Sequence, residues 1–222
     1  MGSLSTTVRP ASRYLTDDEL TKIERAVRLA ESDISGEIVP VFVEKCSPYE
    51  AVKYRVGALA ALGTFLALVA CDRLVTPLAD PLLHLVIVAA SGLLAAALTY
   101  VPAIGRLAAG RKALSQVATQ KAESIFLQEE IFGTRRRRGI LVFIAFFERC
   151  VLIRADKGIA AVVPQRVWDA LEAQLVNAIK SGQLFDGIVA TIAQCGKLME
   201  EYGFKIADDD TDELPNALRN RT

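Results

Sequence analysis

The sequence predicts an α/β protein with a small central sheet flanked by helices, interrupted by a two-helix transmembrane hairpin. Two observations support this fold class. First, two long apolar stretches, residues 56–71 and 82–101, lie in the middle of the chain. Second, β-branched runs alternate with amphipathic helical patterns on both sides of these stretches, which is typical of α/β domains.

The apolar stretches have the length and composition of membrane spans. Residues 82–101 would form a helix of roughly 30 Å, which matches the hydrocarbon thickness of a bilayer. Residues 56–71 reach that length only if the helix starts near Ala51 and Lys53 and Arg55 extend to the headgroups. The alternative is a hairpin buried in a large soluble core, and the composition argues against it, because both stretches are apolar on every face.

Basic residues are unevenly distributed around the hairpin, and this predicts its orientation. The connector between the stretches carries a single basic residue, Arg73. Basic residues beside membrane segments stay in the cytoplasm, so both termini are expected there and the connector outside. The four cysteines have scattered spacings that agree with a reducing compartment and match no metal site. The outer ends of the hairpin carry Lys53, Arg55, Arg106, Arg111 and Lys112.

The region before the hairpin predicts one helix and one strand. Thr16 and Glu19 form a capping-box pattern at the start of the helix. Residues 37–44 are rich in β-branched types and form the expected strand. Pro40 lies inside that strand and therefore predicts an edge position or a bulge.

The region after the hairpin predicts three helices and two strands. A long helix is expected at 106–132, followed by a buried strand at 139–147 and its hairpin partner at 150–155. Pro164 and Gly182 mark the ends of the next helix. The last helix is expected to begin with Asp186 as its N-cap and to end near Tyr202.

These elements predict one domain split by the hairpin. Its first part is expected at residues 14–55 and its second part at residues 102–206, with the transmembrane hairpin at 56–101 between them. Residues 1–13 are expected to form a disordered tail, and residues 207–222 an acidic, flexible one.

A run of four arginines precedes the expected central strand. Beside a membrane, Arg135, Arg136, Arg137 and Arg138 would attract anionic lipid, and the alternative is a solvated loop entering the strand. Nucleic acid is not an expected partner, because the formal net charge is zero and the nearby aromatics belong to an apolar strand.

Three segments together resemble the TPM domain family, named after a thylakoid lumen protein, a photosystem II repair protein and a nematode receptor modulator. Residues 15–44 combine a helix, Ser-Gly-Glu and a strand. Residues 137–171 contain the strand pair, Asp-Lys-Gly-Ile, Val-Pro and a tryptophan, and residues 182–204 contain the last helix. Two apolar segments in the middle are similar to those of bacterial membrane-inserted members.

The resemblance implies a small sheet flanked by helices and leaves the activity open. Some members are acid phosphatases, some are assembly or repair factors for membrane complexes, and some bind metal through acidic loop residues. Glu37 and Asp156 match acidic positions of the family, each at a strand end, and would be the ligands of a divalent cation, Ca²⁺ or Mg²⁺. Two carboxylates do not complete such a site. No other cofactor is evident, and no catalytic residue can be carried over.

The sequence therefore predicts a two-pass protein of the bacterial inner membrane whose cytoplasmic domain is a binding or assembly module. Its expected partners are the lipid bilayer and another membrane protein or complex. The alternatives are a membrane-tethered, metal-dependent phosphatase and a structural subunit of a larger complex. An enzyme needs convergent carboxylates in an open cleft, whereas a binding module can cover them.

Overall fold

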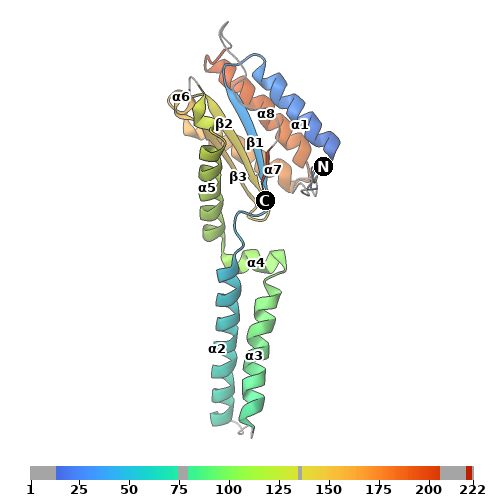
Figure 1. Ribbon diagram of the computed structural model, residues 1–222, viewed down its shortest axis with the longest axis vertical. Helices are drawn as coiled ribbons and strands as arrows, with labels where there is room; N and C mark the ends of the chain where they lie inside the picture. Colours follow the sequence, from blue (N-terminus) through green and yellow to red (C-terminus); the bar gives the residue numbers. More distant parts are fainter. Residues whose placement is uncertain (1–13, 75–79, 135–136, 206–218, 222) are drawn as a thin grey trace, which may run out of the picture. The chain divides into compact units, whose positions relative to one another are not determined.

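The computed structural model describes residues 14–74, 80–134, 137–205 and 219–221 of the 222-residue chain. The chain forms two compact units (Figure 1). The first, here called the α/β unit, comprises Met1–Cys46 and Val117–Thr222, and the second, the hairpin unit, comprises Ser47–Gln116. The expected tail at 1–13 lies outside the described residues, as does most of the expected tail at 207–222.

A mixed sheet with the strand order β3-β2-β1-β4 forms the centre of the α/β unit. β1 (Glu37–Val43) pairs in parallel with β2 (Gly139–Ala145), and β2 pairs antiparallel with β3 (Cys150–Ala155). The expected small sheet is therefore confirmed, with segments from both sides of the hairpin pairing in it. The structure adds a short fourth strand, β4 (Arg219–Arg221), parallel to the end of β1.

Pro40 causes no bulge in β1. The β1–β2 register is one-to-one from Glu37 opposite Gly139 to Val43 opposite Ala145. β4 pairs only with residues 41–43 of β1. Pro40, which has no N–H to donate, thus lies in the part of β1 that β4 does not reach, as the edge rule for proline requires.

Three helices cover one face of the sheet: α1 (Asp17–Glu31), α7 (Gln165–Lys180) and α8 (Leu184–Glu201). α1 begins at the predicted capping box, in which the N–H of Glu19 donates to Thr16 and the N–H of Thr16 donates to Glu19. Burial of each large side chain in this core contributes roughly 1.5–3 kcal/mol. Its fully buried members include Ile23, Phe42, Ile140, Ile153, Trp168, Ile188 and Ile192.

The second half of α5 (Arg111–Gln128) covers the opposite face of the sheet. Ala118, Ala122 and Ile125 pack there against the other side of β1 and β2. Every residue of β1 and β2 is therefore buried. The apolar run expected at 139–147 is therefore a strand covered on both faces as far as Ala145, and its last two residues belong to the turn that follows.

Two expected helix boundaries are wrong. The helix expected at 106–132 is divided into α4 (Pro102–Ala109) and α5, because Gly110 has φ +81° and ψ 144° and cannot continue a helix. Beyond α5 the chain forms a 3₁₀ turn, η2 (Ile131–Gly133). Asp186 is not the N-cap of α8, which begins two residues earlier, after Gln183. Asp186 lies in the first turn instead, where a carboxylate still favours the helix dipole.

The hairpin unit contains α2 (Glu50–Leu74), α3 (Pro81–Leu98) and α4. Asp80 caps α3 by accepting a hydrogen bond of 2.9 Å from the N–H of Leu82. α2 and α3 pack closely where Gly57 faces Gly92. A methyl group added to Gly57 would lie 3.0 Å from the carbonyl oxygen of Gly92, and one added to Gly92 would lie 3.1 Å from that of Gly57.

Candidate functional site

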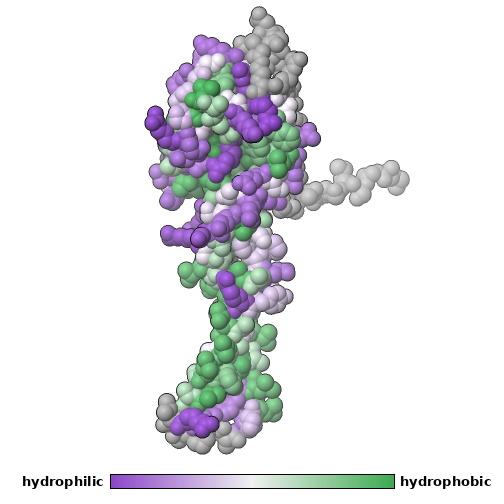
Figure 2. All heavy atoms as spheres, turned by 90° about the vertical axis from the view of Figure 1, so that its left-hand side faces the viewer, coloured by the Kyte–Doolittle hydropathy of each residue, from purple (hydrophilic) through white to green (hydrophobic). Residues whose placement is uncertain are grey.

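The outer surface of α2 and α3 is the first candidate site. Both helices are long and apolar enough, by length and composition, to cross a membrane. Only 6% of the most apolar part of α2 and 0% of that of α3 is buried inside the protein. Neither helix is therefore a buried core helix. Figure 2 shows their apolar surface in green. The exposed large side chains include Leu59, Leu62, Phe65, Leu66, Leu82, Leu85, Leu93 and Leu94.

Basic and aromatic residues gather at the end of the hairpin unit where α2 begins and α3 ends. The Lys53 ammonium lies 4.3 Å from the centre of the Tyr100 ring. The Arg55 guanidinium donates a 3.1 Å hydrogen bond to the carbonyl of Ala108 in α4. Tyr54 and Tyr100 are 74% and 71% exposed. Tyrosines beside cations are typical of the headgroup region of a bilayer.

The other end of the hairpin holds its single histidine. His84 Nε2 lies 3.4 Å from Asp72 Oδ2, which joins the start of α3 to the last turns of α2. His84 therefore makes a contact between the two helices of the hairpin.

The second candidate site is the end of the sheet where β1 and β2 begin. Glu37 lies opposite Gly139 in the β1–β2 register. On the other side of β2, the N–H of Asp156 donates a 2.8 Å hydrogen bond to the carbonyl of Gly139. The fold therefore brings the two predicted acidic residues to one end of the sheet. The spacing of strands places their backbones roughly 10 Å apart, one on each side of β2.

Asp156 is held by neighbouring groups of the protein. Its carboxylate caps α6 (Lys157–Ala160) by accepting the N–H of Lys157 at 2.7 Å. Arg137 reaches the same carboxylate with Nη2 at 3.1 Å from Oδ1 and Nε at 2.8 Å from Oδ2. The two side chains form an ion pair, and the aspartate side chain is only 3% exposed. The buried charge is thereby neutralised within the protein.

Arg138 also makes contacts within the α/β unit. Its guanidinium donates a 2.9 Å hydrogen bond to the Ser35 hydroxyl and lies 5.0 Å from the centre of the Phe204 ring. Its carbonyl accepts the N–H of Glu37 at 3.1 Å. Arg137 and Arg138 thus join the segment before β2 to β1, α6 and the end of α8. Arg135 and Arg136, the other half of the predicted lipid-binding cluster, lie outside the described residues.

The divalent-cation site predicted from Glu37 and Asp156 would need further ligands. Glu37 is 8% exposed, and no group of three or more His, Cys, Asp or Glu side chains comes together within the described ranges. Hard cations take six or more oxygens, so water or backbone carbonyls would complete the shell. The pairing of Arg137 with Asp156 was missed, because nothing in a run of four arginines distinguishes the member that turns inward.

Comparison with known proteins agrees with this architecture. Residues 109–198 match the family model of the TPM domain. The NMR structure of the BA42 protein from the psychrophilic bacterium Bizionia argentinensis is similar to this chain, with a TM-score of 0.57 and 22% sequence identity. That likeness covers 93% of this chain and 94% of the other, and it shows the fold alone. No curated protein matches the sequence. The segment from the end of α4 through most of α8 therefore matches the TPM domain family in sequence, as the motifs of the chain predict.

Proposed function

We propose that this chain is a membrane-anchored TPM protein whose α/β unit is a binding or assembly module for a membrane complex. The bilayer in question is the bacterial inner membrane, crossed twice by α2 and α3. The observation that carries the proposal is the exposure of large apolar side chains along both helices of the hairpin unit. Exposed to water, this surface would far exceed the apolar patches of ordinary soluble monomers.

The orientation rests on the charges at the two ends of the hairpin. Lys53, Arg55 and Arg106 lie beside the exposed tyrosines at one end, and Arg73 is the basic residue of the connector end. Under the positive-inside rule, both termini and the α/β unit are cytoplasmic. Anionic lipid at the arginine cluster, residues 135–138, would add to this anchoring.

The choice of a binding module over an enzyme rests on Asp156. A carboxylate that acts as a metal ligand or general base must offer a free lone pair toward an open space. Asp156 instead caps a helix and is held by Arg137 in a buried pair. This favours a structural role for the sheet end and binding as the activity of the unit.

A membrane-tethered, metal-dependent phosphatase is the second candidate. Its supporting observation is that Glu37 and Asp156 flank Gly139 at one end of the sheet. If this candidate is correct, the purified chain hydrolyses a simple phosphomonoester only with Mg²⁺ or Ca²⁺ present. The double variant Glu37→Gln and Asp156→Asn then loses turnover while its far-UV circular dichroism is unchanged. The binding proposal predicts negligible turnover under all these conditions.

Affinity purification from mildly solubilised membranes tests the binding role. The chain is compared with Ile144→Asp, which places a charge at a buried position near the end of β2 and unfolds the α/β unit. We expect both forms to stay in the membrane after a carbonate wash. A co-purifying membrane protein should be lost with Ile144→Asp and kept with the conservative Ile144→Val. Equal recovery with Ile144→Asp would assign binding to the hairpin and contradict the proposed role of the α/β unit.

A further inference from the structure

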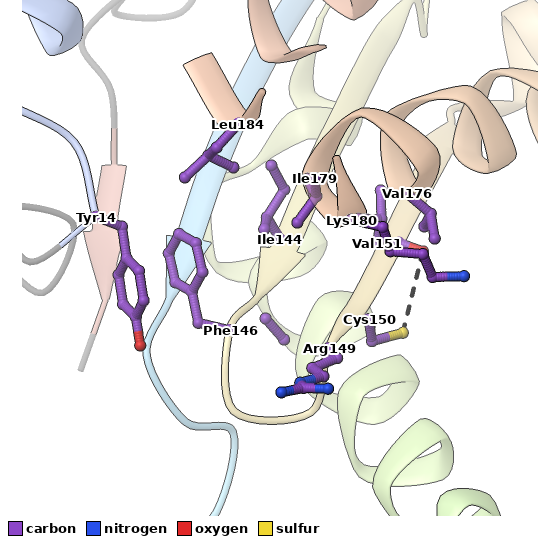
Figure 3. Close-up of a pocket in the computed structure, with 11 residues that line it drawn as sticks. Tyr14, Ile144, Phe146, Arg149, Cys150, Val151, Val176, Ile179, Lys180 and Leu184 are labelled. Carbon is purple, nitrogen blue, oxygen red and sulfur yellow. Dashed lines mark hydrogen bonds between the residues drawn. The ribbon is translucent and has the colours of Figure 1, made fainter. Parts of the chain in front are cut away.

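A cavity of about 520 Å³ opens at the end of the sheet opposite Glu37 and Asp156 (Figure 3). It lies at the turn between β2 and β3 and is bounded by the end of α7 and the start of α8. Pockets of about 300–1,000 Å³ hold small organic ligands. The apolar part of its wall is formed by Ile144, Val151, Val176, Ile179 and Leu184.

Two aromatic rings form another part of the wall. Tyr14 and Phe146 are stacked, with ring centres 3.9 Å apart and planes inclined by 10°. Figure 3 shows the pair side by side at the edge of the cavity, with Ile144 and Leu184 nearby. Tyr14 is 43% exposed, so its ring faces both the cavity and solvent. A hydrophobic or aromatic ligand body therefore has a contact surface on several sides.

The charged groups of this wall are all cationic. Arg149, in the β2–β3 turn, and Lys180, at the end of α7, line the cavity, and no described lining residue is acidic. Neither cation forms an ion pair with any residue in the described ranges. An apolar cavity with two uncompensated cations is complementary to a ligand with an apolar body and an anionic head.

The neighbouring carboxylates are directed to other partners. Glu148 Oε1 accepts a 2.9 Å hydrogen bond from the N–H of Cys46. Glu172 Oε1 accepts the N–H of Ile153 at 2.7 Å and lies 3.2 Å from Arg154. These acids therefore satisfy backbone groups and Arg154, and the cations of the cavity remain available.

The backbone of Arg149 is held in an uncommon conformation. Its φ is +53°, in the left-handed region that residues other than glycine rarely adopt. Such strain collects at ligand sites, where the surrounding structure fixes a side chain in position. The antiparallel β2–β3 pairing, which extends to Ala145 opposite Cys150, fixes this turn.

We infer that this cavity binds a small hydrophobic carboxylate, with the apolar body against the aromatic pair and the carboxylate at Arg149 and Lys180. The inference concerns the α/β unit alone and does not depend on the proposed membrane crossing. It differs from the phosphatase candidate in location, charge and ligand.

Calorimetric titration of the full chain in lipid nanodiscs, with empty nanodiscs subtracted, tests this inference. The probes are 4-phenylbutyrate, the neutral 4-phenylbutanol and the cationic 4-phenylbutylamine, which share one apolar body. We expect the carboxylate to bind about tenfold more tightly than the alcohol, since hydrogen bonds to charged groups contribute that much. The amine should show no saturable binding.

Substitutions then locate the site. Lys180→Gln and Arg149→Gln should each weaken carboxylate binding about tenfold and leave binding of the alcohol unchanged. Lys180 lies on an exposed helix end, so its variant folds even if Arg149→Gln disturbs the turn. Arg166→Gln, an exposed cation at the other end of α7, is the matched control and should change nothing. Equal affinity for carboxylate and alcohol, or equal losses with Arg166→Gln, would overturn the inference.

Discussion

Gly57 and Gly92 lie against one another where α2 crosses α3, each close to the other's carbonyl oxygen. A methyl group added at either position would also lie 3.2 Å from an alanine Cβ of the opposite helix, Ala96 or Ala61. Each glycine thus precedes an alanine by four residues, and the two small pairs interlock. Close backbone approach through small residues is how helices pack in a bilayer, where apolar burial supplies no driving force.

We expect Gly57→Leu and Gly92→Leu each to destabilise the hairpin by about 1–3 kcal/mol, because the larger side chain forces the helices apart. Gly63→Leu is the matched control, since an added Cβ at Gly63 meets no atom within 4 Å. The measurement is an SDS titration of the chain in mixed micelles, followed by a dye on Cys71 in α2. Similar losses at all three glycines would show that the crossing point has no special packing role.

The ion pair between Arg137 and Asp156 should contribute to the stability of the α/β unit. Arg137→Ala leaves the Asp156 carboxylate buried without its countercharge, which should lower the free energy of unfolding by about 1–3 kcal/mol. Arg137 is 45% exposed, so solvent screening reduces this cost below that of a fully buried pair. Urea unfolding followed by the single tryptophan, Trp168, reports on the α/β unit. Lys157→Ala, an exposed neighbour, is the control and should change stability little.

A double-mutant cycle separates the pair from its surroundings. If Arg137 and Asp156 act together, Arg137→Ala should cost little in a background that already carries Asp156→Asn, because that change removes the buried charge. Additive losses from the two substitutions would contradict a direct interaction between them.

Glu172 predicts a pH dependence. Burial raises the pKa of this carboxyl above its ordinary value, with the hydrogen bond from Ile153 and the charge of Arg154 opposing the shift. The folded protein then binds the proton more tightly than the unfolded chain. Stability from this group is therefore present at low pH and is lost as pH rises from about 4.3 through the folded pKa.

We expect Glu172→Gln to remove that decline, since the amide oxygen can still accept the N–H of Ile153 but does not titrate. The difference in unfolding free energy between the wild type and this variant, measured against pH with Trp168 fluorescence, should change within this window. A constant difference would mean that the pKa of Glu172 is the same in the folded and unfolded chain.

The burial of Cys195 predicts that its thiol is unreactive in the folded protein. Its side chain is fully buried on the inner face of α8, and burial raises the pKa of the thiol to about 12. Because the thiolate is the reactive form, a maleimide should modify Cys195 only when urea unfolds the α/β unit. Peptide mass spectrometry that follows the modification against urea checks this, with the transition of Trp168 as reference. Rapid modification of the native protein would contradict the packing of α8.

The sequence predicts much of this fold because its signals are local. The runs at 37–44 and 139–147 carry their own β-branched pattern, and the capping box at Thr16 marks the start of α1. Of the missed features, one depends on a distant partner and one is local. β4 at Arg219–Arg221 has no apolar alternation and exists through backbone pairing with β1. The break at Gly110 was missed because one glycine inside a helical pattern is usually tolerated.

The candidate sites also differ in how far local sequence signals predict them. The apolar surface of α2 and α3 is predictable because each helix comes from one continuous apolar stretch of the sequence. Glu37 and Asp156 were predicted as candidate ligands from the sequence. Their position at one end of the sheet follows from the parallel pairing of β1 with β2. The cavity was not predicted, because Tyr14, Arg149 and Lys180 come together only when three distant segments fold.

We propose that α2 and α3 cross a membrane with both termini on the cytoplasmic side. The most direct measurement places a reporter at the N-terminus, at the C-terminus and, in a third form, within the connector between Leu74 and Asp80. The reporters are a fluorescent protein active in the cytoplasm and a phosphatase active only after export. We expect cytoplasmic signals at both termini and export of the connector reporter. All three reporters on one side of the membrane would contradict a crossing.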